Sequence, residues 1–221
     1  VNLRGALEQS CNTYFVALGQ LLGGETIRAE AEKLGFGTAA QIAPGLKTAA
    51  GTLPEAEALQ NPGELATFSF GQGALTVTPL QITAMMNTAA GGGVYKAPAF
   101  VQGITDGTLT EPLTPAVPRT VLDKATARVL RSMLESVVTD GIGSEARPGE
   151  GTAGGKTGTA QTGQYNAEGE ELLNYWFSGF YPAEAPRYTI TILQDGILKP
   201  ETSSAALFAR VTEILRVWEG G

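Results

Sequence analysis

Residues 153–161 read Ala-Gly-Gly-Lys-Thr-Gly-Thr-Ala-Gln, a short stretch that combines a lysine, two hydroxyls and three glycines. We predict that it forms an extended strand beside a cleft. Side chains alternate between the faces of a strand, so Lys156 and Gly158 point one way, and Thr157 and Thr159 the other. An edge strand can pair with an extended, peptide-like ligand, and a glycine lets that ligand come close. Taken alone, Lys-Thr-Gly is also typical of a glycine-rich turn with a solvated lysine.

A second polar stretch, Ser10-Cys11-Asn12, lies close to the N-terminus. Asn2 can cap a short helix, and Asn12 can cap a second helix that ends at Gly23-Gly24. Ser10 and Asn12 are therefore predicted at a joint between two helices, where polar side chains can project into a cleft. Helix capping alone would also explain both residues.

Together, the two stretches resemble the Ser-x-Asn and Lys-Thr-Gly motifs of the transpeptidase domain of penicillin-binding proteins. The resemblance covers essentially the whole chain, because further segments similar to that family follow in the family's order. These segments are Gly71-Gln72-Gly73, Val77-Thr78-Pro79-Leu80-Gln81, residues 87–95 and Tyr175-Trp176-Phe177-Ser178-Gly179-Phe180. The long connection between Gln161 and Tyr175, and the stretch Arg187-Tyr188-Thr189, are more similar to the monofunctional class B enzymes than to the bifunctional class A enzymes.

The family's third motif, Ser-x-x-Lys, does not occur in the 221 residues, because none of the eight serines has a lysine three positions later. In the family, the serine that becomes acylated precedes the Ser-x-Asn motif by several tens of residues. We therefore expect the 221-residue polypeptide to have no transpeptidase or acylation activity, and a longer parent protein to be acylated.

The resemblance implies acyl transfer from D-alanyl-D-alanine stem peptides of peptidoglycan. Lys156, with the hydroxyls of Thr157 and Thr159, would hold the terminal carboxylate of the peptide, which β-lactam antibiotics imitate. The backbone N–H of Thr159 would be one donor of the oxyanion hole. Ser10 would relay a proton to the leaving amine, and Asn12 would bind a peptide carbonyl of the substrate.

Composition excludes several other kinds of function. A net charge of −7 argues against nucleic acid or an anionic membrane surface as a partner. The absence of histidine excludes a Ser-His-Asp triad and removes the commonest metal ligand, and we expect no metal or cofactor. The lone cysteine, Cys11, cannot form an internal disulfide and is expected to be a small buried side chain.

We predict one α+β domain over residues 1–221, with a mostly helical part up to about residue 150 and a sheet with a terminal helix beyond it. This is a truncated penicillin-binding/serine β-lactamase-like fold. Helices are predicted at 26–34, 79–90 and 123–141, with irregular chain and a short strand near 41–43 between the first two. The lysine strand, 175–181 and 188–194 should form an antiparallel meander.

A helix from about 202 to 218 should cover this meander through one apolar stripe, formed by Leu207, Val211, Ile214, Leu215 and Trp218. The family's sheet has further strands, so the strand at 188–194 should expose an edge that the parent would pair. Such an edge could support self-association.

No signal peptide or membrane-spanning run is visible in the sequence. The resemblance implies a parent anchored by an N-terminal helix, with this domain on the extracytoplasmic face of the bacterial cell membrane. Two alternatives remain. One is a related serine β-lactamase or β-lactam sensor, against which the segment Gly71 to Gln81 favours a penicillin-binding protein. The other is a non-catalytic module that binds a peptide or partner in the Lys156 cleft or at the sheet edge.

Overall fold

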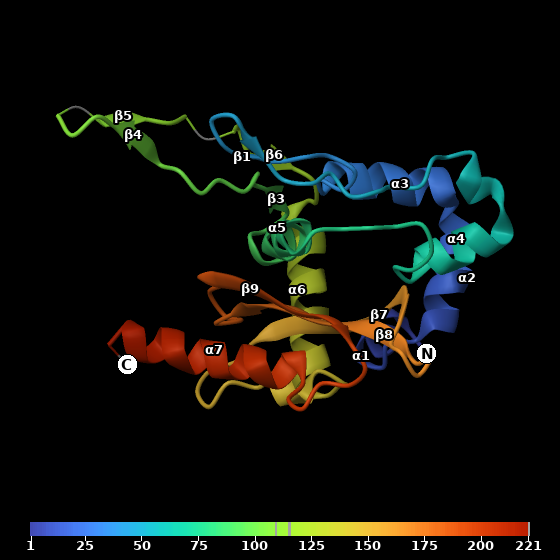
Figure 1. Ribbon diagram of the computed structural model, residues 1–221. Coiled ribbons are helices and arrows are strands. Elements are labelled where there is room, and N and C mark those ends of the chain that lie inside the picture. The colour runs from blue at the N-terminus through green and yellow to red at the C-terminus, as the bar shows by residue number, and fades with distance from the viewer. Residues whose placement is uncertain (109, 115, 221) are drawn as a thin grey trace.

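The computed structural model describes residues 1–108, 110–114 and 116–220. The first part of the chain is mainly helical (Figure 1). Its elements are the helices α1 (Leu3–Glu8), α2 (Asn12–Leu22) and α3 (Gly24–Lys33), the paired strands β1 (Gln41–Ala43) and β2 (Leu46–Lys47), the 3₁₀ turn η1 (Ala58–Gln60), and the helices α4 (Pro62–Ser69) and α5 (Pro79–Ala90).

The second part adds two short antiparallel pairs, a long helix, and a sheet with its terminal helix. The short pairs are β3 (Val94–Tyr95) with β6 (Arg119–Thr120), and β4 (Gly103–Thr105) with β5 (Thr110–Pro112). The remaining elements are α6 (Lys124–Thr139), η2 (Ser144–Ala146), β7 (Gly154–Tyr165), β8 (Glu171–Tyr181), β9 (Tyr188–Ile197) and α7 (Ser204–Trp218).

Capping side chains fix where most of these helices begin. Asn2, Thr78 and Asp123 accept hydrogen bonds from backbone N–H groups of α1, α5 and α6, as predicted. Helix α4 was not predicted, although Asn61 caps it and Pro62 occupies its first turn. The Asn-Pro pair is the local signal that reveals this helix.

Asn12 does not cap α2, which corrects the prediction. Cys11 is the N-cap residue and Asn12 is the first helical residue. The reason lies in Ser10, whose φ of 52° ends α1 in the left-handed region and directs the Cys11 N–H back to the Ala6 carbonyl, at 2.9 Å. The second helix therefore begins one residue earlier than a capping asparagine would allow.

The sheet is the predicted antiparallel meander, in the order β7-β8-β9. Lys156 lies opposite Ser178, and Thr159 opposite Tyr175. The predicted long connection between the first two strands is wrong. Pairing continues past a bulge to Tyr165 opposite Glu171, so only residues 166–170 separate the strands.

Helices cover both faces of the sheet, with α7 on one face and α5 on the other (Figure 1). On the α7 side, Phe177 packs against Phe208 with ring centroids 4.8 Å apart, and both rings are fully buried. On the α5 side, Phe180 packs with Met86 and Leu134. β7 itself pairs with β8 and contacts α6, and these two elements fix the strand that carries Lys156.

The buried face of α7 differs from the predicted stripe. Ile214 is 67% exposed and Trp218 is 77% exposed, whereas Ala205, Phe208 and Thr212 are buried. The Thr212 hydroxyl donates to the Ala209 carbonyl at 2.7 Å, so a polar residue can lie inside without an unpaired group. An apolar pattern cannot detect a buried face made of small and hydroxyl side chains.

The edge of β9 that faces away from β8 pairs with no strand in the described ranges. Within the same ranges, no helix has both the length and the apolar character needed to cross a membrane.

That residues 1–221 form a single domain stays a prediction.

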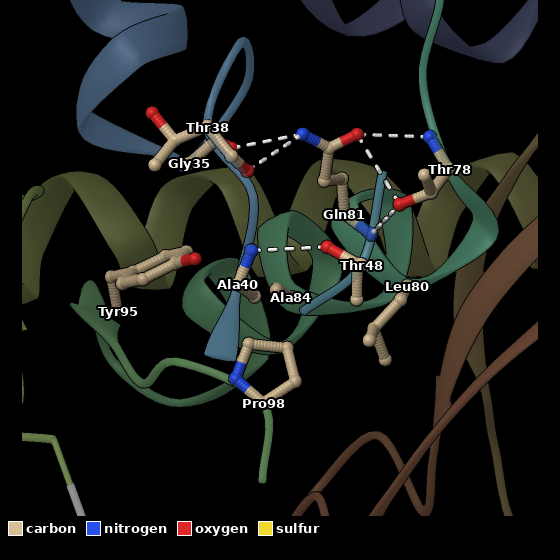
Figure 2. A pocket seen from close by; sticks show the side chains of 10 residues that line it. All are labelled: Gly35, Thr38, Ala40, Thr48, Thr78, Leu80, Gln81, Ala84, Tyr95 and Pro98. Carbon is tan, nitrogen blue, oxygen red and sulfur yellow. Dashed lines mark hydrogen bonds between the residues drawn. The ribbon is translucent and has the colours of Figure 1, made fainter. Parts of the chain in front are cut away.

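Gln81, in the first turn of α5, connects this helix to the chain segment that follows α3 (Figure 2). Its buried side chain accepts from the Thr78 N–H at 2.9 Å and donates to the carbonyls of Gly35 and Ala50 at 3.0 and 2.9 Å. The adjoining cavity has a volume of only about 10 Å³. Gln81 therefore has a structural role, and this small cavity does not form a ligand site.

Candidate active site

The two predicted motifs meet in the folded chain. The Lys156 ammonium donates to the Ser10 hydroxyl, with Nζ and Oγ 2.9 Å apart across 146 positions of sequence. Ser10 lies at the joint between α1 and α2, and Lys156 is the third residue of β7. A hydroxyl from the helical part and an ammonium from the sheet therefore form one polar pair.

Several contacts hold the Ser10 joint in place. Arg4 on α1 donates to the Ser132 hydroxyl on α6 at 3.1 Å, and the Glu8 carbonyl accepts from the Ile142 N–H at 3.0 Å. Among the described residues, Ser10 is the only non-glycine residue with a positive φ. A side chain in this conformation costs on the order of 1 kcal/mol or more, so the surrounding contacts must impose it.

Burial makes the protonated form of Lys156 less favourable than it is in water. Desolvation lowers the pKa of its ammonium from 10.5 to about 8. Besides Ser10, the ammonium donates to the Thr157 carbonyl at 3.1 Å, and it forms no ion pair with a carboxylate of the described chain. The site therefore presents a partly desolvated positive charge that an anion could neutralise.

The outer edge of β7 presents backbone groups to the same region. The Thr157 carbonyl accepts from Lys156, and the Thr159 carbonyl accepts from the Gln72 side-chain amide at 3.0 Å. In an antiparallel pair, a residue directs both its N–H and its C=O either toward the partner strand or away from it. The N–H groups of Thr157 and Thr159 therefore also face away from β8, and Gly158 between them is exposed.

A cavity of about 180 Å³ adjoins Thr157, Gly158 and Thr159. Its other walls include Glu145 of η2 and Ser203 at the start of α7, and the Ser203 hydroxyl donates to the Glu145 carboxylate. Hydroxyl groups and one carboxylate therefore line the space beside the Lys-Thr-Gly segment.

Comparison with known proteins identifies the family. The family model of the penicillin binding protein transpeptidase domain matches residues 1–213. The chain belongs to this family. Stage V sporulation protein D of Bacillus subtilis is 35% identical over 197 residues, which cover 86% of the chain and 29% of that protein. Penicillin-binding protein PbpB of Mycolicibacterium smegmatis is 34% identical over 230 residues, which cover 96% of the chain and 34% of that protein.

Solved transpeptidase structures confirm the predicted fold class. Penicillin binding protein 3 of Mycobacterium tuberculosis, in its apo form, aligns with a TM-score of 0.85 at 28% identity, over 99% of this chain and 52% of that one. The D,D-transpeptidase domain from Eggerthella lenta aligns with a TM-score of 0.81 at 29% identity, over 99% of this chain and 54% of that one. The chain spans about half of those solved chains and about a third of the two curated relatives.

Two residues near the joint between α1 and α2 differ from the predictions. Asn12 is exposed, and its side chain makes no hydrogen bond to any described residue, so the structure does not connect it to Ser10 or Lys156. Cys11 is half-buried rather than buried, with its thiol 3.3 Å from the Thr13 hydroxyl. That hydrogen bond lowers the pKa of the thiol.

Three residues lie beside the Ser-x-Asn and Lys-Thr-Gly motifs although the sequence predicted no individual role for them. Gln72 reaches β7 from the turn after α4, and Glu145 and Ser203 meet at the cavity. For Gln72, the flanking glycines Gly71 and Gly73 were a usable signal, because glycines on both sides indicate a tight turn that holds the side chain between them outward. For Glu145 and Ser203, which are 58 positions apart, the sequence contains no such signal.

Proposed function

We propose that this chain supplies the Ser-x-Asn and Lys-Thr-Gly walls of a peptidoglycan D,D-transpeptidase site, which acts on stem peptides ending in D-alanyl-D-alanine. The observation that carries the proposal is the Lys156–Ser10 hydrogen bond beside the outward-facing edge of β7. Several relatives are named peptidoglycan D,D-transpeptidases, among them PbpA of Mycobacterium tuberculosis and MrdA of Acinetobacter baumannii, and their names support this reaction.

The stem-peptide carboxylate binds at Lys156, with the hydroxyls of Thr157 and Thr159 beside it. A charge-assisted hydrogen bond of this kind is worth about 1.5–3 kcal/mol. The peptide runs along the outer edge of β7 past Gly158, where no side chain obstructs it. The N–H of Thr159 faces that edge and is one donor of the oxyanion hole.

Ser10 carries a proton during the reaction. Its hydroxyl already accepts from Lys156, whose pKa of about 8 lets the amine exchange protons near neutral pH. Ser10 passes the proton toward the leaving amine of D-alanine. Asn12 binds a peptide carbonyl of the substrate, and its exposed position in the first turn of α2 leaves the amide accessible.

β-Lactams are the second proposed ligand class, because their carboxylate imitates that of the peptide. Penicillin binding protein 3 of Mycobacterium tuberculosis was solved in complex with aztreonam and with ampicillin. The 221 residues contain no Ser-x-x-Lys, so we propose that this polypeptide binds such ligands without being acylated. A covalent, heat-stable label after incubation with a fluorescent penicillin would contradict the inactivity.

Calorimetry tests the carboxylate site. An N-acetylated peptide ending in D-alanyl-D-alanine should bind more tightly than the same peptide with an amidated C-terminus. Lys156→Met should abolish that preference, and Lys199→Met, at an exposed lysine, should keep it. Equal binding of the acid and the amide to the wild-type chain would refute the proposal.

The proposed place of action is the extracytoplasmic face of the bacterial cell membrane, where peptidoglycan is assembled, in a parent protein held by an N-terminal anchor. The connection between β7 and β8 is short, so it no longer supports membership of class B. The proposal of class B therefore rests on the stretch Arg187-Tyr188-Thr189 alone. The alternative within the same superfamily is a β-lactamase or a β-lactam sensor. Hydrolysis of a chromogenic β-lactam by the parent protein would favour the β-lactamase.

A non-catalytic module is the alternative from a different class, because the outer edge of β9 is unpaired in the described chain. A second copy of the chain could add its own β9 there. Sedimentation velocity at increasing concentration should then show dimers, and a monomer throughout would count against self-association.

A further inference from the structure

Gln72 already occupies part of the edge at which we place the peptide. Its Nε2 donates to the Thr159 carbonyl at 3.0 Å, across 87 positions of sequence. This is the only side-chain hydrogen bond that Gln72 forms with the described residues. The Thr157 carbonyl on the same edge accepts from Lys156. Both outward carbonyls in this part of β7 are thus paired with side chains of the protein itself.

A peptide that pairs with an edge strand needs such carbonyls as acceptors for its own N–H groups. The Gln72 side-chain amide is chemically close to a peptide amide, and it makes the bond that a ligand N–H would make. We propose that Gln72 is a displaceable placeholder, whose side chain covers the Thr159 carbonyl in the free protein and leaves it when an extended peptide binds along β7. This inference rests on the proposed function.

The backbone around Gln72 is fixed, so the side chain is the part that moves. Gly71 and Gly73 have φ values of +83° and +79°, which favour glycine. The Gln72 N–H donates to the Thr67 carbonyl at 2.9 Å, and a Cβ at Gly73 would lie 2.7 Å from the Thr67 hydroxyl oxygen. The end of α4 therefore presents Gln72 toward β7 in one position.

The placeholder also protects the strand. Unpaired backbone groups on an edge strand invite pairing with other chains. A single neutral hydrogen bond to a half-buried glutamine is strong enough to cover the carbonyl and weak enough to be exchanged for a ligand N–H. Displacement should lower the affinity for the peptide by the net worth of that bond, about two- to tenfold.

Gln72→Met tests the inference, because methionine has a similar length and cannot donate. In calorimetry with the N-acetylated D-alanyl-D-alanine peptide, the Kd of the Q72M chain should be about two- to tenfold lower than that of the wild type. Gln164→Met, at an exposed position farther along β7, should leave the Kd unchanged. Equal or weaker binding by Q72M than by the wild type would overturn the placeholder.

A second measurement needs no variant. In NMR spectra of the wild-type chain, saturation with the peptide should shift the Gln72 side-chain NH₂ resonances toward those of a solvated glutamine. Unchanged resonances with a bound peptide would overturn the placeholder while leaving the proposed function intact. No binding by either the wild type or Q72M would overturn the proposed function, and this inference with it.

Discussion

Lys156 should make the stability of the fold depend on pH, because burial penalises its charge. The folded chain releases the proton near pH 8, whereas the unfolded chain holds it up to about pH 10.5. Between these values the unfolded state binds more protons, so the free energy of unfolding rises with pH. At about 1.4 kcal/mol per pKa unit, this group alone should add about 3 kcal/mol between pH 7 and pH 10.5.

Lys156→Met removes the titrating group and keeps an unbranched side chain of similar length. Its free energy of unfolding minus that of the wild type should therefore fall by about 3 kcal/mol over the same pH range. The loss of the hydrogen bonds to Ser10 and Thr157 lowers the stability of the variant but does not itself titrate. The difference between the two curves isolates the lysine.

Urea unfolding followed by circular dichroism, at half-unit steps of pH, gives this difference. Lys199→Met serves as the control, and its curve should run parallel to that of the wild type. A difference between Lys156→Met and wild type that stays constant from pH 7 to pH 10.5 would show that the folded site does not penalise the ammonium. The proposed proton exchange with Ser10 near neutral pH would then lose its physical basis.

Further substitutions can be measured by the same denaturation assay. Phe208→Ala should cost about 3–5 kcal/mol and Trp218→Ala less than about 0.5 kcal/mol, and the reverse order would restore the apolar stripe predicted for α7. Gly154→Ala should cost about 1–3 kcal/mol, since its Cβ would lie 2.3 Å from a buried phenyl ring; a neutral effect would contradict the close packing. Gln81→Leu should cost about 1–3 kcal/mol because buried carbonyls lose their donor, and unchanged stability would argue against that role. Ser10→Gly should be about 1 kcal/mol more stable than Ser10→Ala, because both lose the hydrogen bond with Lys156 and only alanine keeps the strained Cβ; equal stability would show that φ at this position is not strained.

Elements whose ends carry local chemical signals were predictable from the sequence. The Thr78-Pro79 pair and Asp123 each specify a helix start through a cap that needs no knowledge of the rest of the fold. The strand around Lys156 and its two successors were also predictable, because turn residues separate them. The pairing of Ser10 with Lys156 was predictable only through the resemblance, since nothing local connects residues so far apart.

The sequence failed where tertiary packing decides. The buried face of α7 is made of Ala205, Phe208 and Thr212, and only contact with the sheet selects it over the more apolar face. The hairpin between β7 and β8 continues through a bulge that cross-strand pairing stabilises. Asn12 was assigned as a cap because the left-handed conformation of Ser10 cannot be read from a serine.

The left-handed backbone conformation of Ser10 and the hydrogen bond that its side chain accepts require different residues at the same position. Glycine is the residue that such a helix end favours, but only a hydroxyl can accept from Lys156. Glycine at this position would relieve the backbone strain but remove the polar pair, so a measurement of stability alone does not show whether the pair is present. Directed evolution of this chain needs a ligand-dependent readout in every round if the pair is to survive.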